Sequence, residues 1–126
     1  MNANLKALHD IGQSLWVDNI TRKMLGDGTL QGYIDELSVT GLTSNPTIFE
    51  HAIGAGDLYD GQIAELARHG RSGEDLFFEL ALRDLRRAAD LFRPVFDATD
   101  GVDGFVSLEV SPAIVDDTAR TTAAAA

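Results

Sequence analysis

Three polar side chains that can do chemistry each stand at or near the end of an apolar stretch. Asp18 closes SLWVD (residues 14–18), Asn45 comes just after VTGLT, and Glu109 lies within GFVSLEV (residues 104–110). Two carboxylates in a shared, partly dry site can have separated pKa values, so that one accepts a proton while the other donates one. An asparagine amide beside them can hold a hydroxyl or carbonyl group. This set suits proton transfer on a polyhydroxylated carbonyl compound.

Glycoside hydrolysis also uses two carboxylates, and the distance between them decides its stereochemical course. One sequence does not give that distance, so this second chemistry stays open at this point.

The three stretches are predicted to be strands, and because side chains alternate across a strand, each has two faces. Aliphatic residues share one face of each strand, which suits packing against helices: Leu15 and Val17, Leu42, and Val106, Leu108 and Val110. The opposite face becomes polar toward the carboxyl end of each strand, where it carries Asp18, Thr43, Asn45 and Glu109. In a (β/α)₈ barrel the active site gathers at the carboxyl ends of the strands, so the pattern predicts a site there.

Each of these residues also has a plain structural interpretation. Asp18 could cap the turn that follows it, and Asn45 before Pro46 is a strong helix start because asparagine suits the N-cap and proline the first helical position. Glu109 would be costly in a buried strand unless it is paired with an arginine or used in function. Three polar groups at equivalent strand positions are less easily accidental than any one of them.

Other motifs offer little competing chemistry. His9, His51 and His69 lack the spacing of metal ligands and fall on helical or turn segments, so we expect surface or capping roles and no metal site. The chain has no GxGxxG and no Walker-type loop, so nucleotide binding by those routes is not indicated. The glycines at 54 and 56 are interpreted as a break between helices.

Helical periodicity fills the segments between the strands. A short helix is predicted within residues 3–13, and Thr29 is predicted to cap a second helix. Further helices are predicted to start at Asn45 and to run through Tyr59 and Leu66. The long apolar stripe from Leu76 to Val95 predicts the most extended helix.

Capping signals refine the later helices. Ser72 with Asp75 resembles a capping box at the start of the long helix, and Pro94 is predicted to end or kink it. Asp116 or Asp117 is predicted to open the last helix.

The composition is that of one globular domain: 126 residues, 44% of them hydrophobic. The formal net charge of −10 and the lack of a basic patch argue against nucleic acid and anionic membranes as partners, so we expect neither. There is no apolar run of membrane-spanning length and no secretory signal pattern. The absence of cysteine fits a reducing compartment, so we expect a cytoplasmic protein.

Strands that alternate with helices predict βαβ units and a parallel sheet. Three parallel strands alone would leave exposed edges, and the chain stops within a helix-forming sequence without a glycine cap. We therefore expect residues 1–126 to be the N-terminal part of a larger α/β domain, cut before a fourth strand.

Three blocks of sequence resemble the transaldolase family, in particular its longer bacterial subfamily, some members of which are fused to a phosphoglucose isomerase. The blocks are LWVDNITRKML with Asp18, VTGLTSNPTIFEHAI with Asn45, and VSLEVSP with Glu109. Their order and spacing carry more weight than any single block, and the resemblance runs from about Leu5 to the end of the chain.

This resemblance implies an α/β fold in which about three βα units form the N-terminal portion of a (β/α)₈ TIM barrel. It also implies an enzyme of the pentose phosphate pathway that moves a dihydroxyacetone unit between sugar phosphates through a lysine Schiff base, without a cofactor. By analogy Asp18 would take a hydroxyl proton during C–C cleavage, and Glu109 would act with a water as acid/base. Asn45 would bind the dihydroxyacetone group, with Thr43 close by.

The lysines depart from the family pattern. The nucleophilic lysine of the family lies on the fourth strand, whereas Lys6 is in the first predicted helix and Lys23 just follows the first strand. We therefore predict that the 126-residue chain alone is inactive.

Two alternatives remain beside a transaldolase. One is a non-catalytic half-barrel that acts only by association with itself or with a complementary chain through its exposed sheet edge. The other is a different lysine-dependent aldolase on the same barrel, which would cleave its substrate without transfer to an acceptor.

Overall fold

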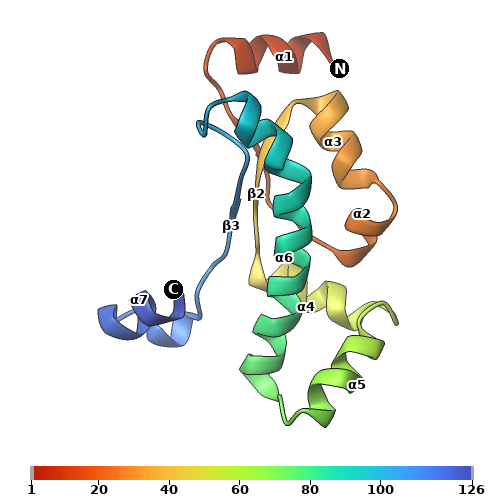
Figure 1. Cartoon of the computed structure of the whole chain (residues 1–126), viewed down its shortest axis with the longest axis vertical. Helices are drawn as coiled ribbons and strands as arrows, with labels where there is room; N and C mark the ends of the chain where they lie inside the picture. Colours follow the sequence, from red (N-terminus) through yellow and green to blue (C-terminus); the bar gives the residue numbers. More distant parts are fainter. Residues whose placement is uncertain (1, 126) are drawn as a thin grey trace.

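The computed structural model describes residues 2–125, and its helices and strands alternate along the chain (Figure 1). The elements are, in order, α1 (Ala3–Asp10), β1 (Leu15–Val17), α2 (Arg22–Gly26), α3 (Thr29–Leu37), β2 (Val39–Thr43), α4 (Pro46–Gly54), α5 (Asp60–Arg68), α6 (Gly73–Ala98), β3 (Phe105–Ser107), the 3₁₀ helix η1 (Pro112–Ile114) and α7 (Thr118–Ala125). Within this range no helix is both long and apolar enough to cross a membrane.

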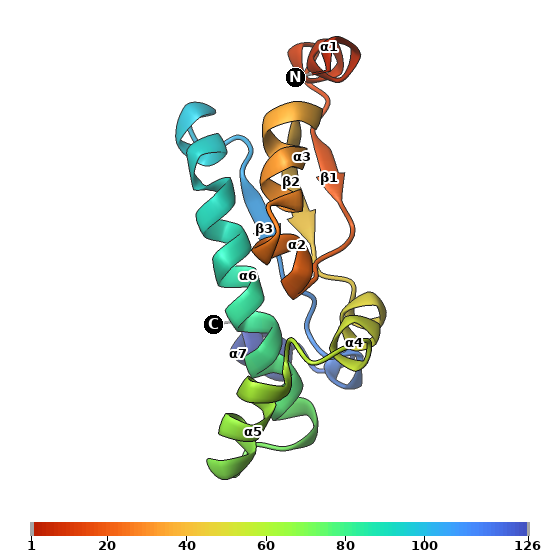
Figure 2. The ribbon, with the colours of Figure 1, turned by 90° about the vertical axis from the view of Figure 1, so that its right-hand side faces the viewer.

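The strands form one sheet in the order β1-β2-β3, and both pairs are parallel. This confirms the predicted parallel α/β arrangement. Thr43 at the end of β2 pairs with Ser107 at the end of β3, and Val17 at the end of β1 pairs with Leu42. The three carboxyl ends therefore lie at the same edge of the sheet. There α4 and α5 lie below the strands, whereas α1 lies at the amino ends (Figures 1 and 2).

Helices α2, α3 and α6 cover one face of the sheet (Figure 2). Leu42 of β2 is fully buried there with Leu30 of α3 and Phe92 of α6, and Val17 and Val106 pack against the same core. The aliphatic face that side-chain parity predicted is therefore confirmed as the face that packs against helices.

The opposite face of the sheet carries two exposed aromatic rings. Trp16 and Phe105 flank Gly41 in one row across the strands, and they are 41% and 46% exposed. Gly41 is required in that row because a Cβ atom there would lie 2.3 Å from Cε2 of the Trp16 indole. The indole thus lies directly over the backbone of β2.

Long helix α6 is confirmed, but Pro94 does not end it, and the predicted capping box at its start is wrong. It continues past Pro94 to Ala98, where Thr99 closes it with a backbone bond and a hydroxyl bond to the Val95 carbonyl. Ser72 does occupy the N-cap, but its side chain makes no capping hydrogen bond. The first helical turn of α6 is therefore not held by a capping box.

Helix α3 also starts differently from the prediction. Its N-cap is Gly28, in a left-handed conformation, and Thr29 is the first helical residue. Thr29 donates both its N–H and its hydroxyl to the Asp27 carboxylate, at 3.0 and 2.6 Å. These bonds lower the pKa of Asp27, because both favour the ionised carboxylate.

The short helix α2 and its anchor were not predicted. Thr21 caps α2 through the Met24 N–H, and Arg22 reaches the fully buried Asp84 of α6 at 3.0 Å. The Tyr59 hydroxyl accepts the Arg22 N–H and donates to the other oxygen of Asp84, at 2.9 Å. Burial, assisted by the charge of Asp84, raises the pKa of Tyr59 to about 12.

Strand β3 is shorter than the predicted residues 104–110, since its ladder ends at Ser107. Glu109 therefore follows the strand instead of lying within it. The prediction for the last helix is confirmed at Asp117, whose carboxylate accepts the Arg120 N–H at 3.0 Å just before α7.

Candidate active site

The carboxyl ends of β1 and β2 bring together three of the four predicted site residues. The Thr43 hydroxyl donates to Oδ1 of Asp18, and the Asn45 amide donates to Oδ2 of Asp18 at 3.4 Å. Both oxygens of one carboxylate are therefore held by donors on the neighbouring strand and its loop. The Asp18 side chain is exposed, so this fixed carboxylate faces solvent.

Helix α4 fixes the orientation of the Asn45 amide. Its Oδ1 accepts the backbone N–H groups of Thr47 and Ile48, at 3.1 and 3.3 Å, which confirms Asn45 as the N-cap before Pro46. With the oxygen committed to the helix, the NH₂ group is the part that points to Asp18. An NH₂ group carries two hydrogens, so one donor is left for a ligand.

Glu109 is not joined to the other three predicted residues. It is exposed, and within residues 2–125 its carboxylate forms no hydrogen bond or ion pair. The expectation of a carboxylate in a buried strand is therefore wrong, because β3 ends two residues earlier. Its backbone is held instead: the Glu109 N–H donates to the hydroxyl of Ser44, at 3.2 Å.

Ser44 was not among the predicted site residues. Parity places its side chain opposite to those of Thr43 and Asn45, and no other sequence pattern marks it as a site residue. Trp16, in contrast, shares a face with Asp18 by the same parity rule. Its position one row below the Asp18 carboxylate could have been anticipated from the alternation alone.

Both carboxylates of the predicted pair are exposed in this chain, so the expected dry, shared pocket is not formed by these residues. No cluster of three or more possible metal ligands occurs in the described part of the chain. Because both Asp18 oxygens are held by Thr43 and Asn45, these three residues can orient a hydroxyl-bearing ligand and accept a proton from it.

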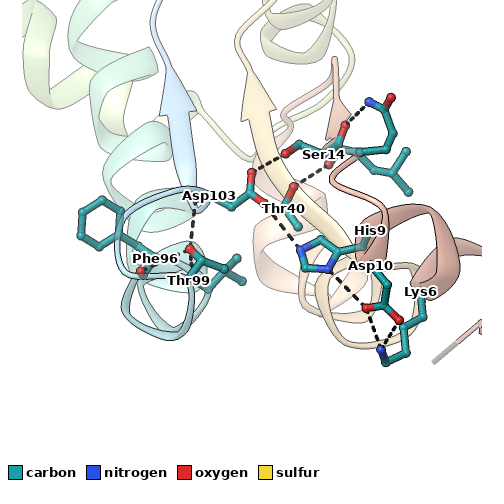
Figure 3. A network of polar contacts seen from close by, with 11 residues as sticks. Lys6, His9, Asp10, Ser14, Thr40, Phe96, Thr99 and Asp103 are labelled. Atoms are coloured by element: carbon teal, nitrogen blue, oxygen red, sulfur yellow. Dashed lines mark hydrogen bonds and ion pairs between the residues drawn. The ribbon is translucent and has the colours of Figure 1, made fainter.

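A second polar cluster lies at the amino ends of the strands (Figure 3). Asp103 is 6% exposed and accepts the Ser14 hydroxyl at 2.6 Å, while Thr99 accepts the Asp103 N–H at 3.0 Å. His9 was predicted to be a surface or capping residue; its Nε2 lies 3.6 Å from the Asp103 carboxylate. A pocket of about 460 Å³ opens beside this cluster, between α1, α3 and the end of α6.

The molecule has an α/β fold of the kind found in (β/α) barrels. Its strands are parallel, helices cover one face of the sheet, and polar groups gather at the carboxyl ends of the strands. The family model described as transaldolase/fructose-6-phosphate aldolase matches residues 15–126. The chain belongs to this family, and its three βα units are the N-terminal portion of a (β/α)₈ barrel.

Curated relatives agree with the family match. The chain is 49% identical to a transaldolase of Thermobifida fusca over 99% of its own length, and 48% identical to one of Saccharopolyspora erythraea over 98%. It is 44% identical to a transaldolase of Kocuria rhizophila over 99% of its length. The chain spans about a third of the length of these relatives, 34%, 33% and 34% respectively.

Proposed function

We propose that this chain is the N-terminal part of a transaldolase. The enzyme would transfer a dihydroxyacetone unit from a ketose phosphate, sedoheptulose 7-phosphate or fructose 6-phosphate, to an aldose phosphate through a lysine Schiff base. The observation that carries the proposal is the exposed Asp18 carboxylate, held by Thr43 and Asn45 at the strand ends of a transaldolase-family chain.

Asp18 is assigned the role of base in C–C cleavage. The carboxylate takes the proton of the substrate hydroxyl, that oxygen becomes a carbonyl, and the C–C bond breaks toward the protonated Schiff base, which accepts the electron pair. The donors Thr43 and Asn45 hold the carboxylate in one orientation, because each of its oxygens accepts one hydrogen bond.

Asn45 is assigned to substrate binding, and Glu109 to acid/base catalysis of Schiff-base formation and hydrolysis. The remaining amide hydrogen of Asn45 binds the dihydroxyacetone group, since the helix cap already fixes the amide oxygen. Glu109 works with a water as acid/base when the Schiff base forms and is hydrolysed. Its exposed and unpaired carboxylate within residues 2–125 is compatible with such a water.

The Schiff-base lysine is assigned to residues outside this chain. Lys6 lies on α1 at the amino ends of the strands and pairs with Asp10 at 2.6 Å, and Lys23 lies on α2. Residues 1–126 would then be one part of a single barrel domain, and further strands would pair with the outer sides of β1 and β3. The 126-residue chain alone is accordingly expected to be inactive.

The test measures transfer by the intact protein from fructose 6-phosphate to an aldose phosphate acceptor. We expect Glu109→Gln and Asp18→Asn each to lower kcat by about 10²-fold or more, the usual loss for a general acid or base. Full activity in both variants would contradict the proposal.

The same assay separates the alternatives. Cleavage of the donor with no dependence on the acceptor would indicate a lysine-dependent aldolase. Absence of both reactions, together with concentration-dependent association, would favour a half-barrel that acts by pairing through its sheet edges.

A further inference from the structure

Ser44 lies between two proposed site residues, but its side chain is turned away from theirs. It is 6% exposed, lies directly after β2, and makes one hydrogen bond to the last residue of β3 and one to the segment that follows β3. Its N–H donates to the Ser107 carbonyl at 3.1 Å, and its hydroxyl accepts the Glu109 N–H at 3.2 Å. The residue after β2 therefore binds the end of β3 and the segment beyond it, on both sides of Leu108.

The hydroxyl replaces a missing bond of the ladder. In a parallel pair, a residue that donates its N–H to one neighbour accepts with its own carbonyl from the residue two positions further along. For Ser44, which donates to Ser107, that regular donor is the Glu109 N–H. The chain turns into α4 immediately after Ser44, because Asn45 is the N-cap and Pro46 the first helical residue. The Ser44 hydroxyl accepts the Glu109 N–H in place of the carbonyl.

This bond matters because little else fixes Glu109. The residue lies beyond the end of β3, is exposed, and has no side-chain partner within residues 2–125. Asp18, in contrast, is held through both carboxylate oxygens. The Ser44 hydroxyl thus ties the Glu109 backbone to the segment between Thr43, the last residue of β2, and Asn45, the N-cap of α4.

We infer that Ser44 is a positioning residue, which places the Glu109 carboxylate relative to Asp18 and Asn45 by holding the Glu109 main chain. The inference rests on the proposed function, in which Glu109 is the acid/base. Ser44 itself touches no reacting atom, so its effect must pass through Glu109.

The first test compares three variants at position 44 in the intact protein. Ser44→Ala removes the acceptor, and Ser44→Cys keeps the volume but offers only a weak acceptor. We expect both to lower kcat about tenfold with KM changed less than about twofold. Ser44→Thr retains the hydroxyl and should recover kcat to within about threefold. Equal kcat in Ser44→Thr and Ser44→Ala would overturn the inference.

The matched control is Ser111→Ala. The Ser111 hydroxyl also accepts one backbone N–H at 3.2 Å, that of Ala113 in η1. Ser44→Ala and Ser111→Ala therefore each remove one hydrogen bond between a serine hydroxyl and a backbone N–H in the same region, but only Ser44 binds Glu109. We expect Ser111→Ala to keep wild-type kcat, and a loss equal to that of Ser44→Ala would overturn the inference.

A double-mutant cycle separates this inference from the proposed function. If Ser44 acts through Glu109, Ser44→Ala should cause no further loss of kcat in a Glu109→Gln background. If the two losses multiply, Ser44 acts independently and the inference fails while the proposed function stands. If Glu109→Gln alone leaves kcat unchanged, it is the proposed role of Glu109 that fails.

Discussion

The two ends of the parallel sheet carry polar clusters that are built in opposite ways. At the amino end Asp103 is buried, and both its carboxylate and its N–H are bound by Ser14 and Thr99 (Figure 3). At the carboxyl end Asp18 and Glu109 are exposed, and the Asp18 carboxylate is held by donors from Thr43 of β2 and from Asn45, which follows β2. We therefore propose that the amino-end cluster stabilises the fold and that the carboxyl-end residues bind a ligand, because active sites of (β/α)₈ barrels lie at the carboxyl ends of the strands.

The largest expected effect is a loss of kcat from a substitution at the carboxyl end of the sheet. Asp18→Asn should lower kcat of the intact protein by about 10²–10⁴-fold, because the proton acceptor is lost. Its free energy of unfolding should change by no more than about 1 kcal/mol, since the side chain is exposed. Steady-state kinetics and urea unfolding measure the two quantities. A large loss of stability with unchanged kcat would contradict the account, because Asp18 would then have a structural role and not a catalytic one.

The corresponding change at the amino end is Asp103→Ala. It leaves the partly buried Ser14 hydroxyl without its acceptor and removes a buried side chain, so we expect a loss of about 1–3 kcal/mol in unfolding free energy. The kcat of the folded protein should not change. Asp97→Ala is the control, because its ion pair with Arg93 is exposed and worth about 0.5 kcal/mol or less. Equal stability of the two variants would contradict the structural role of Asp103.

Between the two ends of the sheet, Gly41→Ala tests whether the Trp16 indole lies over the backbone of β2. The added methyl group would overlap the indole, so we expect about 1–3 kcal/mol of destabilisation and a changed emission of this single tryptophan. Gly32→Ala is the control: a Cβ there meets no atom within 4 Å, and alanine suits the interior of α3, so stability should rise by about 0.5–1 kcal/mol. Unchanged emission and stability in Gly41→Ala would show that Trp16 does not lie over β2.

A smaller effect concerns the buried cluster on the helical side of the sheet. Because the pKa of Tyr59 is raised to about 12, the unfolded chain loses this proton at a lower pH than the folded one. The contribution of Tyr59 to stability is therefore complete below pH 10 and declines as the pH rises toward 12. Tyr59→Phe should cost about 1 kcal/mol at neutral pH and remove that alkaline decline. If the stability of the variant declines in the same way at alkaline pH, groups other than Tyr59 cause the decline.

The local features of the site could be predicted from the sequence. The bounds of β2, the N-cap at Asn45 and the common face of Asp18, Thr43 and Asn45 all follow from short-range rules: strand alternation and the start of a helix at Asn-Pro. These rules involve residues that are adjacent or nearly so in the chain. The structure then brings Asp18 to Asn45 because β1 and β2 are parallel neighbours.

The long-range partners could not be predicted in this way. Arg22 meets Asp84 and Ser14 meets Asp103 only after the helices and strands have packed, and no periodicity marks such a pair. The extent of β3 was also missed, because apolar alternation continues through Val110 while the ladder stops at Ser107. Because the chain turns into α4 directly after Ser44, β2 offers no further backbone partner to the residues after Ser107. The Ser44 hydroxyl accepts the Glu109 N–H instead.

Trapping of the covalent intermediate tests the central claim most directly. The intact protein and residues 1–126 are each incubated with fructose 6-phosphate and borohydride, and the modified peptide is located by mass spectrometry. We predict a reduced dihydroxyacetone adduct on one lysine of the intact protein outside residues 1–126, its formation slowed in Glu109→Gln, and no adduct on residues 1–126 alone. An adduct on Lys6 or Lys23, or none on the intact protein, would contradict the account.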